Sequence, residues 1–380
     1  MVSTITARIY AELRGDKAIW AILILLAVFS ILAVYSSTGT LAYKERGGNT
    51  EAFLIKHGVI LLGGIFLTYI AHMLHYTKYN RVAPVLLVLS VPLLMYTLAF
   101  GADINDAKRW IELPFVGITI QTSDFAKLAL IIYVARAISA KQDYIKDFNS
   151  AFLPIIVPVL IICGLIAPAD LSTAILLFLT CLFMMFIGRV ALKYIGVLLL
   201  WGVVVFAFLI VLGRFYPDSV RVDTWANRME EFMNTPDGGY QVQQAKIAIA
   251  NGGVVGNGPG NSTKRNFLPS PYSDFIYAII CEEYGLIGGI VVIFLYLLLF
   301  FRVVRLVTKS PKAFGAMMAI GLSLSMVLQA FANIAVSVHL VPVTGVTLPM
   351  ISMGGTSMLF TSLAFGIILS VSKYIEAVSD

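Results

Sequence analysis

Long apolar runs separated by short polar stretches extend from one end of the sequence to the other. Because the hydrocarbon core of a bilayer is about 30 Å thick, a helix needs about 20 mostly apolar residues to cross it. Runs of about that length, bounded by charged or turn-forming residues, predict ten membrane-spanning helices. They cover Ile19–Tyr35, Phe53–His72, Val82–Phe100, Phe125–Ala140, Phe152–Ile166, Ser172–Ile187, Ala191–Leu212, Phe275–Phe301, Ala313–Val338 and Ser352–Ser370. The fourth, fifth and sixth runs are short, which predicts helices that are shielded by neighbours or border a wet cavity.

The composition agrees with a membrane protein and excludes other classes. The chain has 380 residues, of which 59% are hydrophobic and 13% charged, against about 45–50% and about 25% in soluble domains. Because so few charged side chains cannot cover a water-facing surface, we expect residues 1–380 to form one all-α polytopic membrane domain. Cys163, Cys181 and Cys281 lie in apolar runs, where thiols act as small hydrophobic groups, and no structural disulfide is expected.

The positions of the basic residues predict the orientation in the membrane. More than half of the 27 Lys and Arg fall on one side if the N-terminus is cytoplasmic, as the positive-inside rule requires. They stand singly between apolar runs, so the net charge of +6 does not indicate a nucleic-acid partner. Met1–Trp20 lacks a small-residue cleavage site, so the first run is expected to be a retained anchor. We therefore expect a multi-pass protein of the cytoplasmic (inner) membrane with both termini inside.

This orientation places two polar segments outside, residues 101–124 and the much longer 213–274 between the seventh and eighth helices. A loop of about 60 residues is far above the usual length and is expected to carry function. Within it, Tyr240–Ala250 can form a helix with one apolar face, which we expect to lie in the membrane interface. The chain has no internal repeat of fixed period, which disfavours an inverted-repeat transporter.

The sequence offers no metal site and no nucleotide site. None of His57, His72, His75 and His339 has metal-ligand spacing to Cys or acids. The glycine-rich segment 256–262 lacks the GK[ST] and the βαβ context of a phosphate loop. Its glycines can still expose backbone N–H groups to an anion on a membrane-bound substrate.

Acids in or beside the apolar runs are the informative residues, because burying a carboxylate is costly. Asp274 follows Ser273 and opens a long apolar run, so it is either a helix cap or a base at the outer membrane surface. A helix dipole would lower the pKa of Asp274, so strong basicity requires apolar surroundings. Five acids occupy such positions: Asp124, Asp170, Asp274, Glu282 and Glu283.

Two further groups have both a structural and a functional interpretation. Glu282 lies eight residues after Asp274, about 12 Å deeper along a helix, so the two should not pair. Glu282 or Glu283 is expected to meet a base on another helix, with Lys127 as the candidate, or else to contact substrate. Arg109-Trp110 offers a cation for a phosphate and a ring for a sugar, although Trp also anchors helices at the interface.

Seven ordered sequence blocks resemble those of the SEDS glycosyltransferases (shape, elongation, division and sporulation; the FtsW, RodA and SpoVE group), which polymerise lipid II into peptidoglycan. The resemblance covers most of the chain. The blocks are Ala107-Lys-Arg-Trp-Ile111, Gln121-Thr-Ser-Asp-Phe-Ala-Lys127, Pro168-Ala-Asp-Leu-Ser-Thr-Ala174, Gly239-Tyr-Gln241, Leu268-Pro-Ser-Pro-Tyr-Ser-Asp-Phe-Ile276, Glu282-Glu-Tyr-Gly285 and Pro342-Val-Thr-Gly-Val-Thr-Leu-Pro-Met-Ile-Ser-Met-Gly-Gly-Thr-Ser357.

Three blocks depart from the family pattern. Gln-Pro-Ser-Glu is here Gln121-Thr-Ser-Asp124, His-Thr-Asp is Tyr272-Ser-Asp274, and Ser-Tyr-Gly-Gly is Ser352-Met-Gly-Gly355. The Asp is kept, whereas the His of a His-assisted proton relay is absent. Gly258-Pro-Gly-Asn-Ser262 resembles the division (FtsW-like) members more than the elongation (RodA-like) members.

The resemblance implies that the 4-hydroxyl of an acceptor lipid II attacks the anomeric carbon of a donor, and undecaprenyl diphosphate leaves. A base must take the hydroxyl proton, and cations must stabilise the leaving diphosphate. By the resemblance Asp274 is the base. The candidates for the diphosphate are Arg109, Lys127, Lys264 and Arg265, and those that would line the cavity are Trp110, Gln121, Ser123, Asp170 and Gln241.

Partners and cofactors follow from the same resemblance. The family implies a class B penicillin-binding protein as partner, a transpeptidase with one transmembrane helix, besides lipid II and membrane lipids, and location at the division septum. No cofactor is evident, and a divalent cation stays open because hard cations need only a few oxygens and substrate phosphates. A flippase of lipid-linked precursors and a non-catalytic scaffold are the alternative functions.

Overall fold

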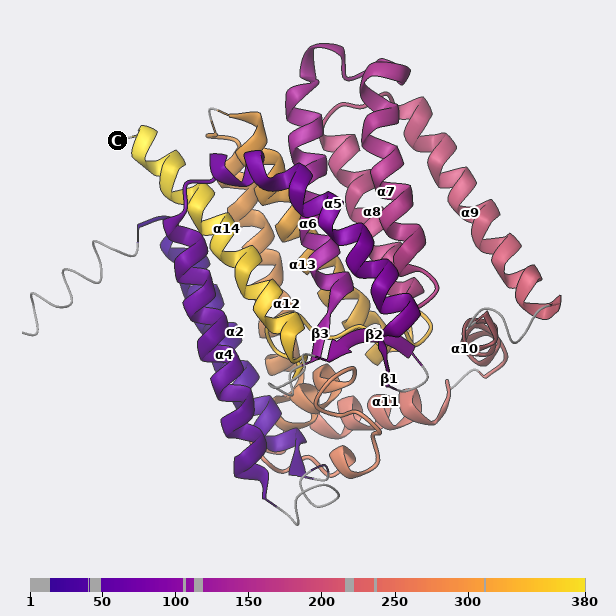
Figure 1. Ribbon diagram of the computed structural model, residues 1–380. Coiled ribbons are helices and arrows are strands. Elements are labelled where there is room, and N and C mark those ends of the chain that lie inside the picture. The colour runs from indigo at the N-terminus through magenta and orange to yellow at the C-terminus, as the bar shows by residue number, and fades with distance from the viewer. Residues whose placement is uncertain are drawn as a thin grey trace, which may run out of the picture.

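The protein is a bundle of long helices with a small sheet at one end (Figure 1). The structure is a computed structural model. It describes residues 14–39, 41, 49–104, 107–112, 119–215, 222–235, 238–310 and 312–379.

Each of the ten apolar runs corresponds to a helix. These helices are α2 (Lys17–Ser37), α4 (Thr50–Met73), α5 (Thr77–Phe100), α6 (Thr122–Ala140), α7 (Leu153–Ile166), α8 (Leu171–Ile187), α9 (Leu192–Phe215), α12 (Ile276–Val307), α13 (Ala313–Ser337) and α14 (Thr356–Ser379). Seven helical segments of the described chain are long and apolar enough to cross a membrane. The other three are α6, which carries three charged residues, and α8 and α9, whose apolar segments are shorter. The fold is therefore all-helical in its main body, with seven candidate spans.

Burial separates the central helix from the peripheral ones. Helix α13 packs against α12, α6, α14 and α8, and most of its side chains are buried. Helix α4 has a face of large apolar side chains, Ile55, Val59, Leu62 and Phe66, that are each more than 60% exposed. An apolar face of this extent is what a lipid-facing helix requires.

The segment expected to be an outer loop, residues 101–124, instead contains a sheet. Strands β1 (Ala102–Ile104), β2 (Ala107–Glu112) and β3 (Thr119–Gln121) pair antiparallel in the order β1-β2-β3. The strands are too short for apolar alternation to reveal them. The all-α fold class holds for the chain, and the sequence predicted no strands within this segment.

The long polar segment between α9 and α12 contains two helices, α10 (Val222–Asn234) and α11 (Tyr240–Gly252). The predicted apolar face of α11 exists, since Val242, Ala245 and Ala248 are buried. It packs against α12 instead of lying free for the membrane interface. Gly252 permits this approach, because a Cβ there would come within 1.9 Å of the Cys281 carbonyl oxygen.

Helix α12 is interrupted at Gly285, which has φ 67° and ψ −168°. The backbone N–H groups of Leu286 and Ile287 donate to the carbonyls of Gly253 and Val254, at 2.9 and 3.3 Å. A side chain at position 285 would meet the Val254 carbonyl oxygen at 2.3 Å. Glycine is required here both for the positive φ and for this contact. The segment after α11 is thus bonded into the gap in α12.

The two ends of the bundle differ. The three strands, α10 and α11 lie at the lower end in Figure 1, and the C-terminal end of α14 lies at the upper end. At the upper end Asp16 caps α2 and accepts from both Nε and Nη2 of Arg302, at 3.0 and 2.6 Å. The three cysteines are buried and free.

Candidate active site

Asp274 lies in the turn that precedes α12, at the end of the bundle that holds the sheet. The N-cap residue of α12 is Phe275, without a side-chain cap bond, so the interpretation of Asp274 as a helix cap was wrong. Its carboxylate accepts from the hydroxyl of Ser273 at 3.0 Å. The side chain therefore stays available to act on another molecule.

A segment without regular structure, residues 338–355 between α13 and α14, holds the turn around Asp274 in place. Buried Asn333 on α13 donates to the carbonyls of Asp274 and Val346, at 2.7 and 2.8 Å. The hydroxyl of Ser352 donates to the Ser273 carbonyl at 2.7 Å. The N–H of Met353 donates to the Tyr272 carbonyl at 2.9 Å. These bonds fix the backbone of Asp274 from three sides.

Charged groups from three distant parts of the chain act on Asp274. Burial raises the pKa of this carboxyl above its ordinary value, and the negative charge of Asp170 raises it further. The hydrogen bond from Ser273 and the guanidinium groups of Arg228 and Arg109 lower the pKa and so offset part of this rise. A carboxylate with a raised pKa is a better proton acceptor than an exposed aspartate. The arrangement thus combines a base with two cations.

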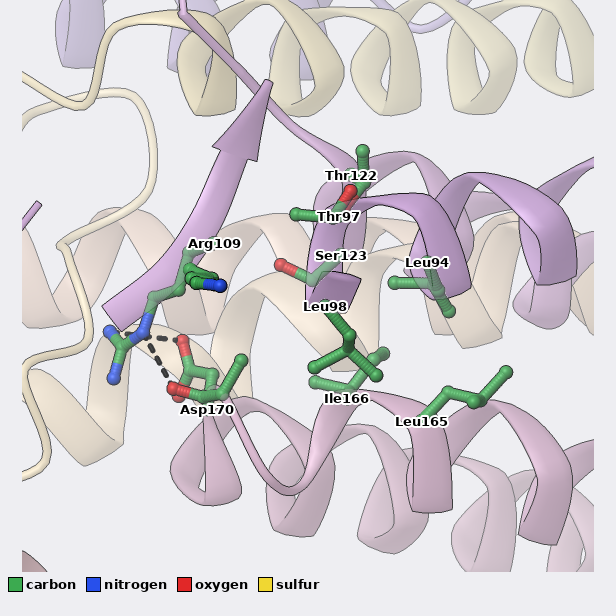
Figure 2. Close-up of a pocket in the computed structure, with 11 residues that line it drawn as sticks. Leu94, Thr97, Leu98, Arg109, Thr122, Ser123, Leu165, Ile166 and Asp170 are labelled. Atoms are coloured by element: carbon green, nitrogen blue, oxygen red, sulfur yellow. Dashed lines mark hydrogen bonds and ion pairs between the residues drawn. The ribbon is translucent and has the colours of Figure 1, made fainter. Parts of the chain in front are cut away.

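Arg109 is presented by β2 toward the beginning of α8 (Figure 2). Its Nε donates to the Ala169 carbonyl at 2.7 Å, and its Nη1 lies 3.4 Å from Asp170 Oδ2. Asp170 is the N-cap of α8 and accepts from the Thr173 N–H at 3.1 Å. With 21% of the side chain exposed, the guanidinium keeps donors free for a ligand.

A small cavity, partly open to solvent, lies beside this ion pair. Its polar wall is formed by Lys108, Arg109, Ser123 and Asp170. Its apolar wall comes from α5 and the end of α7 (Figure 2), with Leu94, Leu98, Leu165 and Ile166. A cavity that is charged on one side and apolar on the other suits an amphipathic ligand.

The other residues predicted to line the cavity lie on the sheet or on α11. Trp110 is half-buried on β2, directly opposite Gln121 of β3. The amide of Gln121 donates to the Ser123 hydroxyl at 3.1 Å, and of these two residues Ser123 lines the cavity. Gln241 is exposed in the first turn of α11.

Lys127 does not pair with Glu282 or Glu283, and that prediction was wrong. Its ammonium lies 3.0 Å from Asp124 Oδ1 and 3.0 Å from Gln329 Oε1. These groups line a second cavity of about 330 Å³ between α6, α13 and α14. The amide nitrogen of Gln329 donates to the Thr347 carbonyl at 3.0 Å. Lys127 thereby supports the segment that holds Asp274.

Replacing Lys127 by Ala is expected to lower the melting temperature. Asp124 is 4% exposed and its Oδ2 has no partner among the described residues, so the variant would strand a buried charge at a cost on the order of 3–5 kcal/mol. The double change Lys127→Ala with Asp124→Asn should recover much of this loss. Melting curves and lipid II binding isotherms decide the matter. Unchanged stability with lost binding would instead make Lys127 a diphosphate ligand.

Glu282 and Glu283 bind the glycine-rich loop rather than a base on another helix. Glu282 accepts from the hydroxyls of Ser262 and Thr263 and from the N–H groups of Thr263 and Lys264. Glu283 accepts from the Ser262 N–H at 3.3 Å. Within residues 256–262, the N–H groups of Gly256, Asn257, Gly258 and Asn261 donate to backbone carbonyls, and that of Ser262 donates to Glu283. The prediction that this loop opens its N–H groups to a substrate anion was therefore wrong at these positions.

The side chains of Lys264 and Arg265, both predicted to bind the diphosphate, contact other parts of the chain. Arg265 donates to the Ser36 carbonyl near the end of α2 at 3.0 Å, and the Lys264 ammonium lies 5.1 Å from the Phe267 ring centroid. The cations that the structure brings to Asp274 are Arg109 and Arg228.

Arg228 is the cation that the sequence analysis did not select. It lies on α10, and its Nη1 donates to the Val343 carbonyl at 3.0 Å. It stands in Val222–Asn234, a strongly amphipathic helix of the outer segment. That amphipathic pattern was the available signal, because it predicts a helix that packs on the bundle.

Metal ligands were also sought within the described ranges. No group of three or more His, Cys, Asp or Glu side chains that could hold a metal ion occurs there.

Known proteins resemble this chain over nearly its whole length. A family model described as "Cell cycle protein", for FtsW, RodA and SpoVE, matches residues 16–377. A "Probable peptidoglycan glycosyltransferase FtsW" of Geobacter sulfurreducens is 32% identical over 371 residues, covering 96% of each chain. The "Peptidoglycan glycosyltransferase MrdB" of Escherichia coli K12 is 32% identical over 369 residues, covering 96% of this chain and 95% of its own.

Solved structures show the same fold. A chain described under "Structural coordination of polymerization and crosslinking by a peptidoglycan synthase complex" superposes with a TM-score of 0.71 at 22% identity, covering 95% of this chain and 98% of its own. The rod shape determining protein RodA of Thermus thermophilus gives 0.66 at 21% identity, covering 94% and 96%. The family match spans nearly all of the sequence, and the chain belongs to the FtsW, RodA and SpoVE family of cell cycle proteins.

Proposed function

We propose that this protein is a peptidoglycan glycosyltransferase that polymerises lipid II at the outer face of the cytoplasmic membrane. Relatives of that name align over 96% of the chain. The observation that carries the proposal is that Arg109, Arg228 and Asp170 act electrostatically on Asp274, and that Arg109 and Asp170 also line a cavity with one charged and one apolar wall.

Asp274 is the general base of the reaction. As the 4-hydroxyl oxygen of the acceptor sugar bonds to the anomeric carbon of the donor, the hydroxyl proton moves to the carboxylate. Burial supports this role, because it raises the pKa of Asp274 and so strengthens its affinity for the proton. Asn333 and Ser352 keep the turn around Asp274 in place for the transfer.

The two guanidinium groups stabilise the leaving diphosphate. Breakage of the bond between the anomeric carbon and oxygen leaves the electron pair on undecaprenyl diphosphate, and the negative charge grows there. Arg109 can bind phosphate oxygens bidentately, and Asp170 orients it through the 3.4 Å ion pair. Arg228 supplies a second positive charge near Asp274.

The form of the cavity matches a lipid-linked substrate. Its charged wall suits the diphosphate, and its leucine and isoleucine wall suits the first isoprenoid units of the carrier. The rest of the polyprenyl chain would remain in the bilayer, beside exposed apolar faces such as that of α4.

The reaction needs no cofactor in this proposal, because the sugar diphosphate carries its own leaving group. A divalent cation would find two carboxylates here, those of Asp274 and Asp170. Phosphate oxygens of the substrate and water would have to supply the remaining ligands.

We further propose ten membrane crossings, the seven candidate spans together with α6, α8 and α9. With both termini cytoplasmic, the sheet, α10 and α11 face outward. A single-span class B penicillin-binding protein is the proposed partner; the related structure of a peptidoglycan synthase complex supports this choice.

Residues 258–262 favour a role in division, and hence at the septum, over one in elongation. Identity does not separate the two branches, since the FtsW and MrdB relatives are both 32% identical. Rescue of cells depleted of their division polymerase, but not of cells depleted of their elongation polymerase, is the result expected for the division branch.

Reconstitution with lipid II tests the function directly. The purified chain, alone and with the transpeptidase, should produce glycan polymer and release undecaprenyl diphosphate. Translocation of lipid II without polymer formation would identify a flippase. If the chain neither polymerises nor translocates lipid II, it is a scaffold.

A further inference from the structure

The end of the bundle away from Asp274 carries a second group of positive charges that the polymerase reaction does not use. Lys78 near the start of α5, Lys312 before α13 and Lys373 on α14 come from separate parts of the chain. They surround His75 and Tyr374, and these five residues are called the basic cluster below.

The contacts of the basic cluster show that its members converge. The rings of His75 and Tyr374 lie 3.8 Å apart between centroids, and the Lys373 ammonium lies 5.9 Å from the Tyr374 ring. Lys312 and Lys78 both act electrostatically on His75 and, together with burial, lower its pKa. His75 is therefore uncharged near neutral pH, and the three lysines supply the positive charge.

Buried Tyr76 gives the basic cluster a rigid base. Its ring stacks on His75 at 5.0 Å and packs on Phe314 at 6.5 Å. It also lies against Gly315, where a Cβ would come within 3.0 Å of the ring. The start of α13 is thereby held beside the link between α4 and α5.

The backbone at this place adds further positive potential. Helix α13 begins here without a side-chain cap bond, whereas the first three N–H groups of α5 donate to His75 and Tyr76. Uncapped N–H groups at a helix N-terminus favour an anion. The Nδ1 of His75 accepts from the Thr77 N–H at 3.3 Å, which leaves Nε2 to carry the ring proton and donate.

The ion pairs between side chains that the structure describes do not include the lysines of the basic cluster. They join Arg109 to Asp170, Lys127 to Asp124 and Arg302 to Asp16. Scattered basic residues would satisfy the positive-inside rule equally well. Three lysines converging on one aromatic pair between helices form instead a local concentration of positive charge that suits a phosphate group.

We propose that the basic cluster binds the headgroup of an anionic phospholipid from the cytoplasmic leaflet. The proposal rests on the orientation given under Proposed function and is independent of the polymerase reaction. The lysines and His75 Nε2 contact the phosphate oxygens, the rings of Tyr374 and Tyr76 contact the glycerol region, and the acyl chains extend along the apolar surface of the bundle.

Native mass spectrometry of the full chain with phosphatidylglycerol, cardiolipin or phosphatidylcholine tests the site. The triple variant Lys78→Gln, Lys312→Gln, Lys373→Gln should bind phosphatidylglycerol at least about tenfold more weakly than wild type. The matched control is Lys193→Gln, whose ammonium lies over the Tyr194 ring at 4.8 Å without such a cluster; it should bind as wild type. If the triple variant does not fold, the three single variants are compared instead.

Other outcomes would overturn the proposal. Equal binding by the triple variant and wild type, or equal retention of phosphatidylcholine, would show that the basic cluster does not select an anionic lipid. Competition by millimolar inorganic phosphate would identify a free phosphate as the ligand. Labelling of Lys78→Cys from outside intact cells would place the site in the other leaflet. These binding results do not depend on whether the protein has polymerase activity.

Discussion

Asp274→Asn is expected to abolish polymerisation, with a loss of at least about 100-fold in rate, within the range of general-base contributions. The amide has the size of the carboxylate and can still accept from Ser273, but it cannot take the hydroxyl proton. The measurement is the initial rate of glycan polymer formation by purified protein. The control is Asp143→Asn, an exposed acid elsewhere in the chain. A variant with the wild-type rate would remove Asp274 from the mechanism.

The raised pKa of Asp274 also predicts the direction of two pH effects. Activity requires the carboxylate, so the rate should rise with pH through the pKa of Asp274 and fall below it. The folded chain holds this proton more tightly than the unfolded chain, so the free energy of unfolding decreases as pH rises from the ordinary aspartate pKa through the raised one. The side chain in Asp274→Asn does not ionise, so the free energy of unfolding of this variant does not decrease in the same way. The melting temperature of the variant at pH 7 should therefore equal or exceed that of wild type.

Arg109→Ala is expected to reduce kcat/KM for lipid II by about 100-fold, as loss of one preorganised donor to a developing negative charge does. Arg109→Lys should retain more activity, because an ammonium keeps the charge but cannot bind the diphosphate bidentately. Loss of the guanidinium also leaves Asp170 with only its bond from the Thr173 N–H. The measurement is the rate against lipid II concentration for both variants.

The control for Arg109 is Arg305→Ala, an exposed arginine near the end of α12. Its rate should match wild type. If Arg109→Ala and Arg109→Lys both polymerise at the wild-type rate, Arg109 only anchors the chain at the interface.

The sequence predicted the helices well because apolar runs of 20 residues leave few alternatives in a membrane. It failed where contacts depend on irregular backbone. Residues 338–355 have no period, so their carbonyl bonds to Asn333, Arg228 and Gln329 could not be derived. The three-residue strands β1 and β3 were not predicted for the same reason, because they are too short to show a period.

Two other errors had different causes. Lys127 and Asp124 have an i, i+3 spacing on one helix, whereas the prediction placed the partner of Lys127 on another helix. Glu282 and Glu283 were treated as acids in need of a cation, whereas backbone N–H and hydroxyl donors satisfy Glu282 and much of Glu283. A carboxylate can be stabilised by dipoles alone.

We expect the interruption of α12 at Gly285 to make the position of Asp274 less sensitive to the thickness of the bilayer. The part from Leu286 to Val307 is about 33 Å long at 1.5 Å per residue, enough to cross the hydrocarbon core by itself. A transmembrane helix adapts to a thinner or thicker bilayer by changing its tilt. Here two backbone bonds, from Leu286 and Ile287 to Gly253 and Val254, hold the start of this part, and a change of tilt bends the chain beside them, while Ile276–Tyr284 stays bonded to residues 257–264 through backbone carbonyls and carboxylates. The catalytic end is thereby expected to keep its geometry in membranes of different lipid composition.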